Sequence, residues 1–289
     1  MKKDGFTLIE IIVAMAILSI LAGTLAPMMY RVWESNEIAV TRERMVDLKT
    51  AIAGSRELIQ QGVRSHYGFV GDVGVIPDTL DDLVTDSGAW TNWNGPYLGG
   101  GFNPSTFKLD AWSNPIIFTE HSPPLVVSGE SIAATLRSAG SDRIIGTSDD
   151  IDENSDLSLQ ILSKDVWPTA DIQGNLTLTL TATSAATPSY FATLRSNFAN
   201  GTGTANASTG CIALNIGPVE ADVPKNIVQA FDTSFPVSLP IGKITLRSRL
   251  FSDSGCTVLL EETSDMAIFI SDGLIELSIN PPTLYYRIN

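Results

Sequence analysis

The chain has 289 residues, enough for roughly two domains of ordinary size. Its 18 Lys and Arg residues stand against 32 Asp and Glu, so the formal net charge is -14. This balance excludes a protein that holds nucleic acid or an anionic membrane surface by bulk positive charge. The 44% of hydrophobic and 17% of charged residues also exclude a wholly disordered chain.

The N-terminus carries a long apolar run, from Phe6 to Tyr30, in which Glu10 is the only charge. As a helix it would rise about 37 Å, enough to cross a hydrocarbon core of about 30 Å. Lys2 and Lys3 precede the run, which predicts a cytoplasmic N-terminus with the remaining chain outside. The alternative is a cleaved secretory signal, but the apolar core of such signals usually spans only about 7–15 residues.

Glu10 requires an explanation, because a carboxylate in an apolar span costs about 2.5–3.5 kcal/mol at the bilayer centre and less near an edge. One explanation is structural: the side chain lies near the cytoplasmic face and reaches towards water. The other is functional: a neighbouring chain supplies a cation. If the chain were cut after Gly5, Phe6 would carry a new amine, and that ammonium would pair strongly with the Glu10 carboxylate of a neighbour in a low-dielectric setting.

The segment Gly5-Phe6-Thr7-Leu8-Ile9-Glu10, which follows a short basic leader, resembles the cleavage and methylation motif of type IV pilins and type II secretion pseudopilins. The resemblance continues through the apolar run to Pro27, where many pilins also have proline and where a bend is expected. It implies cleavage after Gly5 by a prepilin peptidase, methylation of the Phe6 amine and assembly of a helical filament. Asp4 departs from the pattern, since these leaders are usually basic next to the glycine.

Beyond Tyr30 the composition changes to mixed charge, and apolar residues recur at helical spacing. Ile38, Met45, Ile52 and Ile59 lie seven residues apart, with Leu48 between them. This pattern predicts an amphipathic helix over 31–64, with one stripe packed against a sheet.

For residues 65–165, the many glycines, prolines, asparagines and aspartates predict loops and short strands, with a short helix that begins after Pro77. Within this region, Gly95-Pro96-Tyr97-Leu98 and the turn Asp110-Ala111-Trp112-Ser113-Asn114-Pro115 resemble elements of the type II secretion major pseudopilin head. Ala111 and Ser113 depart from that family's turn. The nearby aromatic residues invite a sugar-stacking role, although aromatic residues so closely spaced more often form a core.

An acidic loop is the one candidate ion site. The segments Leu136–Asp142 and Gly146–Ile151 resemble the pseudopilin calcium loop, which implies one bound calcium ion. Carried over, the ligands would be the side chains of Asp142, Asp149 and Asp150 and carbonyl oxygens near Leu136 and Ser138. From composition alone, a solvated acidic loop without metal is the favoured alternative.

The remaining chain, 166–289, exceeds what the resemblance explains. Leu176, Leu178 and Leu180 alternate with threonines, and similar short runs up to the C-terminus predict a small antiparallel sandwich, with an exposed loop at 196–210. Cys211 and Cys256 are the only cysteines. In an exported domain they are expected to form a disulfide, which would contribute about 4 kcal/mol on a chain-entropy estimate, unless they remain two buried thiols.

The sequence gives no pattern for catalysis, because its two histidines lack metal-ligand spacing and no nucleophile or phosphate-binding motif occurs. We therefore expect a non-enzymatic α+β chain with five parts: a leader (1–5), a transmembrane helix (6–30), an amphipathic helix (31–64), a pseudopilin-like head (65–165) and a β-sandwich (166–289).

Such a chain would be anchored in the inner membrane with its heads in the periplasm, and would assemble with itself and other pilin-like subunits at an inner-membrane platform. Membrane lipid surrounds its helix before assembly, and no nucleic-acid partner is expected. The alternative is a surface-binding module, for a sugar or a protein, that the helix merely tethers to the membrane.

Overall fold

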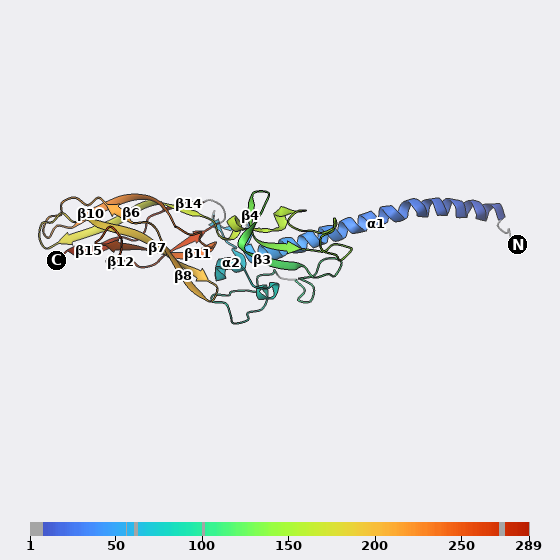
Figure 1. Ribbon diagram of the computed structural model, residues 1–289, viewed down its shortest axis with the longest axis horizontal. Helices are drawn as coiled ribbons and strands as arrows, with labels where there is room; N and C mark the ends of the chain where they lie inside the picture. Colours follow the sequence, from blue (N-terminus) through green and yellow to red (C-terminus); the bar gives the residue numbers. More distant parts are fainter. Residues whose placement is uncertain (1–7, 56, 61–62, 100–101, 272–274, 289) are drawn as a thin grey trace.

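The computed structural model describes residues 8–55, 57–60, 63–99, 102–271 and 275–288. The molecule is long and narrow (Figure 1). The helix α1 (Leu8–Ala53) projects from one end, a mixed head lies in the middle, and a β-sandwich forms the opposite end with the C-terminus. The predicted α+β class, a long helix followed by β-rich units, is confirmed.

The two halves of α1 have different surroundings. Up to about Glu37 its side chains are mostly exposed, whereas Met45, Leu48 and Ile52 of the predicted stripe are fully buried in the head. Figure 1 shows the exposed half leaving the head as a single curved rod. The apolar stripe is therefore the surface by which the helix is fixed to the head.

The helix ends earlier than the sequence analysis predicts, at Ala53 instead of about 64. Gly54 follows in the left-handed region (φ 76°), where glycine commonly ends helices, and its N–H donates to the Thr50 carbonyl at 2.8 Å. The Arg64 guanidinium then donates to the carbonyls of Ala53 and Ser55. Ile59, expected on the stripe, lies exposed in β1 (Ile59–Gln60), which pairs with β2 (Val63–Arg64).

The head packs short elements around the buried end of α1. In chain order they are α2 (Gly68–Val73), the 3₁₀ helix η1 (Leu80–Leu83), β3 (Ile117–Val127), β4 (Glu130–Arg137), the 3₁₀ helix η2 (Leu157–Leu159), β5 (Ile161–Leu162) and α3 (Ser163–Val166). The strands form a sheet in the order β3-β4-β5. Phe69 is fully buried at the centre, and the rings of Trp90 and Tyr97 lie edge-on against it. Of the two roles considered for the aromatic residues, sugar stacking or core packing, these residues have the second.

The sandwich consists of two sheets that share one apolar core. One sheet contains β6 (Ala170–Ala182), β10 (Lys225–Ser234), β14 (Ile275–Ile279) and β15 (Leu284–Ile288). The other contains β7 (Tyr190–Asn200), β8 (Gly203–Ser208), β9 (Ile212–Leu214), β11 (Gly242–Phe251), β12 (Leu259–Glu262) and β13 (Met266–Ile270). Leu176, Leu178 and Leu180 face the core, as the alternation predicts.

The expectation of a purely antiparallel sandwich is wrong for two strands. Both β14 and β15 pair with β6 in parallel, along different parts of its length. The chain crosses from the other sheet after β13 and continues past Pro281 and Pro282, which lack the N–H that a strand needs to pair. One long strand therefore carries two short parallel partners in succession.

The predicted loop at 196–210 is also wrong, because β7 and β8 form an antiparallel hairpin through this segment. Gly201 makes the turn with a positive φ of 66°. Ser196 of β7 and Ala207 of β8 pair with each other and are buried, and most of their neighbours along both strands are also small or polar. Such residues give only a weak strand pattern in the sequence.

The head and the sandwich are joined by close backbone packing. A Cβ atom on Gly242 would lie 2.5 Å from the Gly71 carbonyl oxygen, so a glycine at 242 is needed for α2 to approach β11 this closely. The turn between β7 and β8 is fastened to the head by hydrogen bonds from Gly201 N to Val73 O (2.8 Å) and from Thr91 N to Gly201 O (3.0 Å). The sandwich is therefore attached as a rigid extension of the head.

Candidate functional site

The predicted processing residues Gly5 and Phe6 lie outside the described residues, so the cleavage prediction remains one from sequence. The described chain begins at Leu8, and Glu10 lies in the first turn of α1 with an exposed side chain. Glu10 is thus presented on the outside of the helix, close to its start.

From Leu8 to Tyr30, the exposed half of α1 is apolar except at Glu10 and a few small polar residues. Among the described residues it is the one helix long and apolar enough to cross a membrane, and none of its most apolar stretch is buried within the chain. Pro27 lies within this half, and the helix continues unbroken from Leu8 to Ala53. Because a helix apolar on all sides needs lipid or protein around it, this half of α1 is a surface for membrane and neighbouring chains.

The acidic loop is folded around the Asp149 carboxylate. Its Oδ2 accepts hydrogen bonds from Ser141 N (2.8 Å), Ser141 Oγ (3.0 Å) and Asp142 N (3.1 Å), and its Oδ1 accepts one from Thr147 Oγ1 (2.8 Å). Burial of Asp149 opposes its ionisation, but these hydrogen bonds outweigh that effect and hold the pKa of its carboxyl below the usual value. Asp149 is therefore an acceptor for the loop's own N–H and O–H groups.

The other predicted calcium ligands are also engaged within the chain. Asp150 accepts from Gly146 N at 2.7 Å, Asp142 accepts from Ile144 N at 2.8 Å, the Leu136 carbonyl accepts from Gln160 Nε2, and the Ser138 carbonyl accepts from Ile151 N. Across the described chain, no three His, Cys, Asp or Glu side chains gather closely enough to hold a metal ion. The oxygen atoms that the resemblance assigns to calcium thus accept hydrogen bonds within the chain, and calcium binding stays a prediction from the resemblance.

A buried polar network, which the sequence analysis missed, ties this loop to α1. The Asp110 carboxylate accepts from Ser138 Oγ (2.7 Å) and Asn114 N (2.7 Å), while Asn114 Nδ2 donates to the Gly140 carbonyl (3.0 Å). On the helix, Arg44 Nη1 donates to the carbonyls of Leu109 and Asp110 at 2.8 Å. The Asp110–Pro115 turn is visible in the sequence, but its partners lie too far along the chain to be inferred from spacing.

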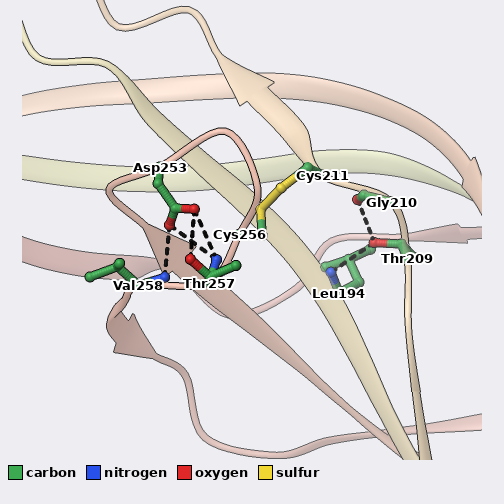
Figure 2. The surroundings of a disulfide bond; sticks show 8 residues. All are labelled: Leu194, Thr209, Gly210, Cys211, Asp253, Cys256, Thr257 and Val258. Atoms are coloured by element: carbon green, nitrogen blue, oxygen red, sulfur yellow. Dashed lines mark hydrogen bonds between the residues drawn. A yellow bond between two sulfur atoms is a disulfide. The ribbon is translucent and has the colours of Figure 1, made fainter.

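The two cysteines form a disulfide, Cys211–Cys256, with Cα atoms 6.1 Å apart (Figure 2). It joins the start of β9 to the loop between β11 and β12. In that loop the Asp253 carboxylate accepts from Val258 N (2.7 Å) and Thr257 N (3.0 Å), and these hydrogen bonds lower the pKa of Asp253 below its usual value. The expected disulfide is therefore present, and it fixes a loop that is also held by its own carboxylate.

Comparison with known proteins gives one match. The family described as "Prokaryotic N-terminal methylation motif" matches residues 1–26. No curated protein matches the chain, and no solved structure matches it either. The matched residues include Gly5, Phe6 and Glu10 and overlap the exposed half of α1. The chain therefore carries, ahead of its head and sandwich, the N-terminal methylation motif of a pilin or pseudopilin leader.

Proposed function

We propose that this chain is a structural subunit of a filament, either a type II secretion pseudopilus or a type IV pilus. The observation that carries the proposal is the methylation motif at 1–26, which runs directly into a helix that is apolar and exposed on all sides. Before assembly that helix lies in the inner membrane, with the basic leader in the cytoplasm and both folded units in the periplasm. Its role is mechanical, not catalytic.

In this proposal a prepilin peptidase cuts after Gly5, and the new Phe6 amine becomes methylated. Glu10 then guides docking, because its carboxylate attracts the Phe6 ammonium of the neighbouring subunit where little water screens the charges. The exposed half of α1 exchanges lipid for contacts with other subunits at an inner-membrane platform. Calcium in the acidic loop remains part of the hypothesis that the resemblance implies, and no step of assembly depends on it here.

The methylation motif supports a subunit role over that of a tethered module, because a module that only needs an anchor has no need for a processing signal at residues 1–26. The large sandwich would lie on the filament surface or at its tip. A specialised, minor subunit is therefore proposed, because bulky units crowd a tightly wound helical filament.

The decisive experiment is Glu10→Ala, with Glu43→Ala as the matched control on an exposed position of the same helix. Mass spectrometry of the wild-type chain should find a mature N-terminus at methylated Phe6, and Glu10→Ala should still be cut. Incorporation into filaments, measured by shearing and immunoblotting, should be lost in Glu10→Ala and retained in Glu43→Ala. A chain that retains Met1, or a Glu10→Ala chain that assembles normally, would overturn the proposal and favour the tethered module.

A further inference from the structure

A cleft with both polar and apolar lining residues lies where the head meets the six-stranded sheet of the sandwich. It has a volume of about 370 Å³, within the range of roughly 300–1,000 Å³ typical of sites for small ligands. Head and sandwich both contribute to its lining: Gly71, Asp72 and Asn92 from the head, and Asn197, Phe198, Ala199, Thr204, Lys243 and Thr245 from the sandwich. No single unit of the chain contains the site.

The walls of this cleft are held in place by the backbone. Gly71, which lines it, is the residue that packs against Gly242, and the β7–β8 turn beside it is bonded to Val73 and Thr91. In Figure 1, β8 reaches from the sandwich to the loops of the head near α2. A ligand would therefore meet a preformed site, which reduces the entropic cost of binding.

Several polar side chains of the cleft have unused hydrogen-bonding capacity. Among the described residues, no hydrogen bond or ion pair within the chain involves the side chains of Asn92, Asn197, Thr204, Thr245 or Lys243. Asp72 accepts from the Tyr97 hydroxyl at 3.1 Å through Oδ2, which leaves its other oxygen for a further donor. The amides, hydroxyls and carboxylate of the cleft together provide hydrogen-bond donors and acceptors. Neighbouring hydroxyl groups of a sugar need both, because each hydroxyl can donate and accept.

The polar surface continues from the cleft along the outer face of the sheet. Thr245 pairs with Asn197 and Arg247 with Arg195 across β11 and β7, and Asn206 and Ser208 continue the same rows on β8. Arg247 is neutralised by Glu262 and Asp265. In the described part of the chain Arg195 has no such carboxylate partner, and its buried Nε lacks a hydrogen-bond acceptor. Among the described residues, two cations of this surface thus have no ion-pair partner within 4.0 Å: Lys243 in the cleft, which it shares with Asp72, and Arg195 beyond it.

We propose that this cleft and the adjoining face bind an acidic oligosaccharide, with a carboxylate of the sugar at Lys243 and its hydroxyls at Asn92, Asn197 and Asp72. A protein partner fits this surface less well, because the centres of protein interfaces are depleted in charged residues and enriched in aromatic ones. The site goes beyond filament assembly: it lies where the head meets the sandwich, outside the exposed half of α1 that would pack against other subunits.

The test uses the full-length chain in detergent micelles, titrated calorimetrically with hexagalacturonate. Wild-type protein should bind the probe with a dissociation constant below about 1 mM. Lys243→Gln and Asn197→Ala should each weaken binding about tenfold, as expected for the loss of one well-placed hydrogen bond to a charged or polar group. Lys225→Gln, on the opposite sheet, is the matched control and should bind as wild type. Unchanged melting midpoints confirm that each variant is folded.

Two further probes distinguish charge from sugar recognition. Fully methyl-esterified hexagalacturonate, which lacks the carboxylates, should bind about tenfold more weakly, and hexaglutamate, which lacks the hydroxyls, should not bind at millimolar concentration. Equal binding of either probe overturns the proposal, as does wild-type affinity in Lys243→Gln. Absence of binding to hexagalacturonate and to other acidic hexasaccharides overturns it as well. Glu10→Ala should bind like wild type, so failure of filament assembly would not be mistaken for failure of this site.

Discussion

The head and the sandwich bury different kinds of side chain. In the head the core includes Asp110, Asn114, Ser138 and Gln160, each almost completely buried and hydrogen-bonded. Both units also have an apolar core. Among the described residues, the polar side chains buried in the sandwich are hydroxyls only: Thr193, Ser196, Thr209, Ser248 and Thr263. The sandwich is therefore specified mostly by alternation along its strands, while the head depends on polar bonds between distant segments.

This difference fits the positions of the two units. The head must hold loops of irregular shape against one side of α1, which a regular sheet cannot do, so buried side chains satisfy the loop backbone. The sandwich needs only to stand rigidly beyond the head and present an outer face. Substitutions in the two units should consequently act through different mechanisms and unfold different parts of the chain.

The largest effect is expected in the buried half of α1. Leu48→Ala removes a side chain that is only 1% exposed and should lower the unfolding free energy of the head by about 2–5 kcal/mol. Leu18→Ala is the matched control, since Leu18 is 63% exposed in the other half of the same helix. Urea unfolding of the detergent-solubilised chain, followed by tryptophan fluorescence, measures both. Equal destabilisation by the two variants would contradict the division of α1 into a buried and an exposed half.

Removal of the disulfide should act on the sandwich. The double variant Cys211→Ser and Cys256→Ser is expected to destabilise it by about 2–4 kcal/mol, because the reduced chain gains freedom in the unfolded state. Hydrogen exchange should become faster in β9 and β11 and stay unchanged in α2. Wild-type protein treated with a reductant is the control and should behave like the double variant. Faster exchange confined to the head would contradict this assignment.

The sequence predicts some elements of both units and misses others, and contrast in hydropathy along the chain decides which. Leu176, Leu178 and Leu180 alternate with threonines, so β6 is readable from local pattern, and the stripe at Met45, Leu48 and Ile52 is equally plain. The hairpin through 196–210 is not, because alanine, serine and threonine on both faces give almost no contrast in hydropathy. Polar-rich strands of this kind are fixed by their neighbours in the sheet.

The candidate sites follow the same rule. Glu10 stands out because one charge in a long apolar run is visible without any structure. For Asp149 the sequence predicts only that it lies in an acidic loop. Its role as an acceptor for Ser141, Asp142 and Thr147 depends on the path of the loop backbone, which the sequence does not show. The cleft could not be found at all, since Asn92, Asn197 and Lys243 are far apart in the chain and meet only when head and sandwich pack together.

The joint between the units can be tested with glycine substitutions. Gly242 has a φ of 102° and lies against Gly71, so Gly242→Ala should cost about 1–3 kcal/mol through backbone strain and loss of the close contact. Gly203→Ala is the matched control, because nothing lies within 4 Å of the added Cβ. Limited proteolysis should cut the segment around Pro168 faster in Gly242→Ala alone. If both variants resist protease equally, the two units do not depend on this contact for their rigid attachment.

The smallest effect is expected in the acidic loop. Asp149→Ala leaves the N–H groups of Ser141 and Asp142 without their acceptor and should destabilise the head by about 1 kcal/mol at neutral pH. Since the pKa of Asp149 is lower in the folded chain than in the unfolded one, its contribution is complete above about pH 4 and is lost as the pH falls through the folded value. The wild-type and Asp149→Ala melting midpoints should therefore converge in acid.

The same melting series, repeated with a calcium chelator, tests the calcium hypothesis. That hypothesis expects the wild-type midpoint at neutral pH to fall, whereas an unchanged midpoint means that the loop is held by its own hydrogen bonds. Substitution and chelation thus separate two ways of holding one loop, by internal acceptors or by an added cation.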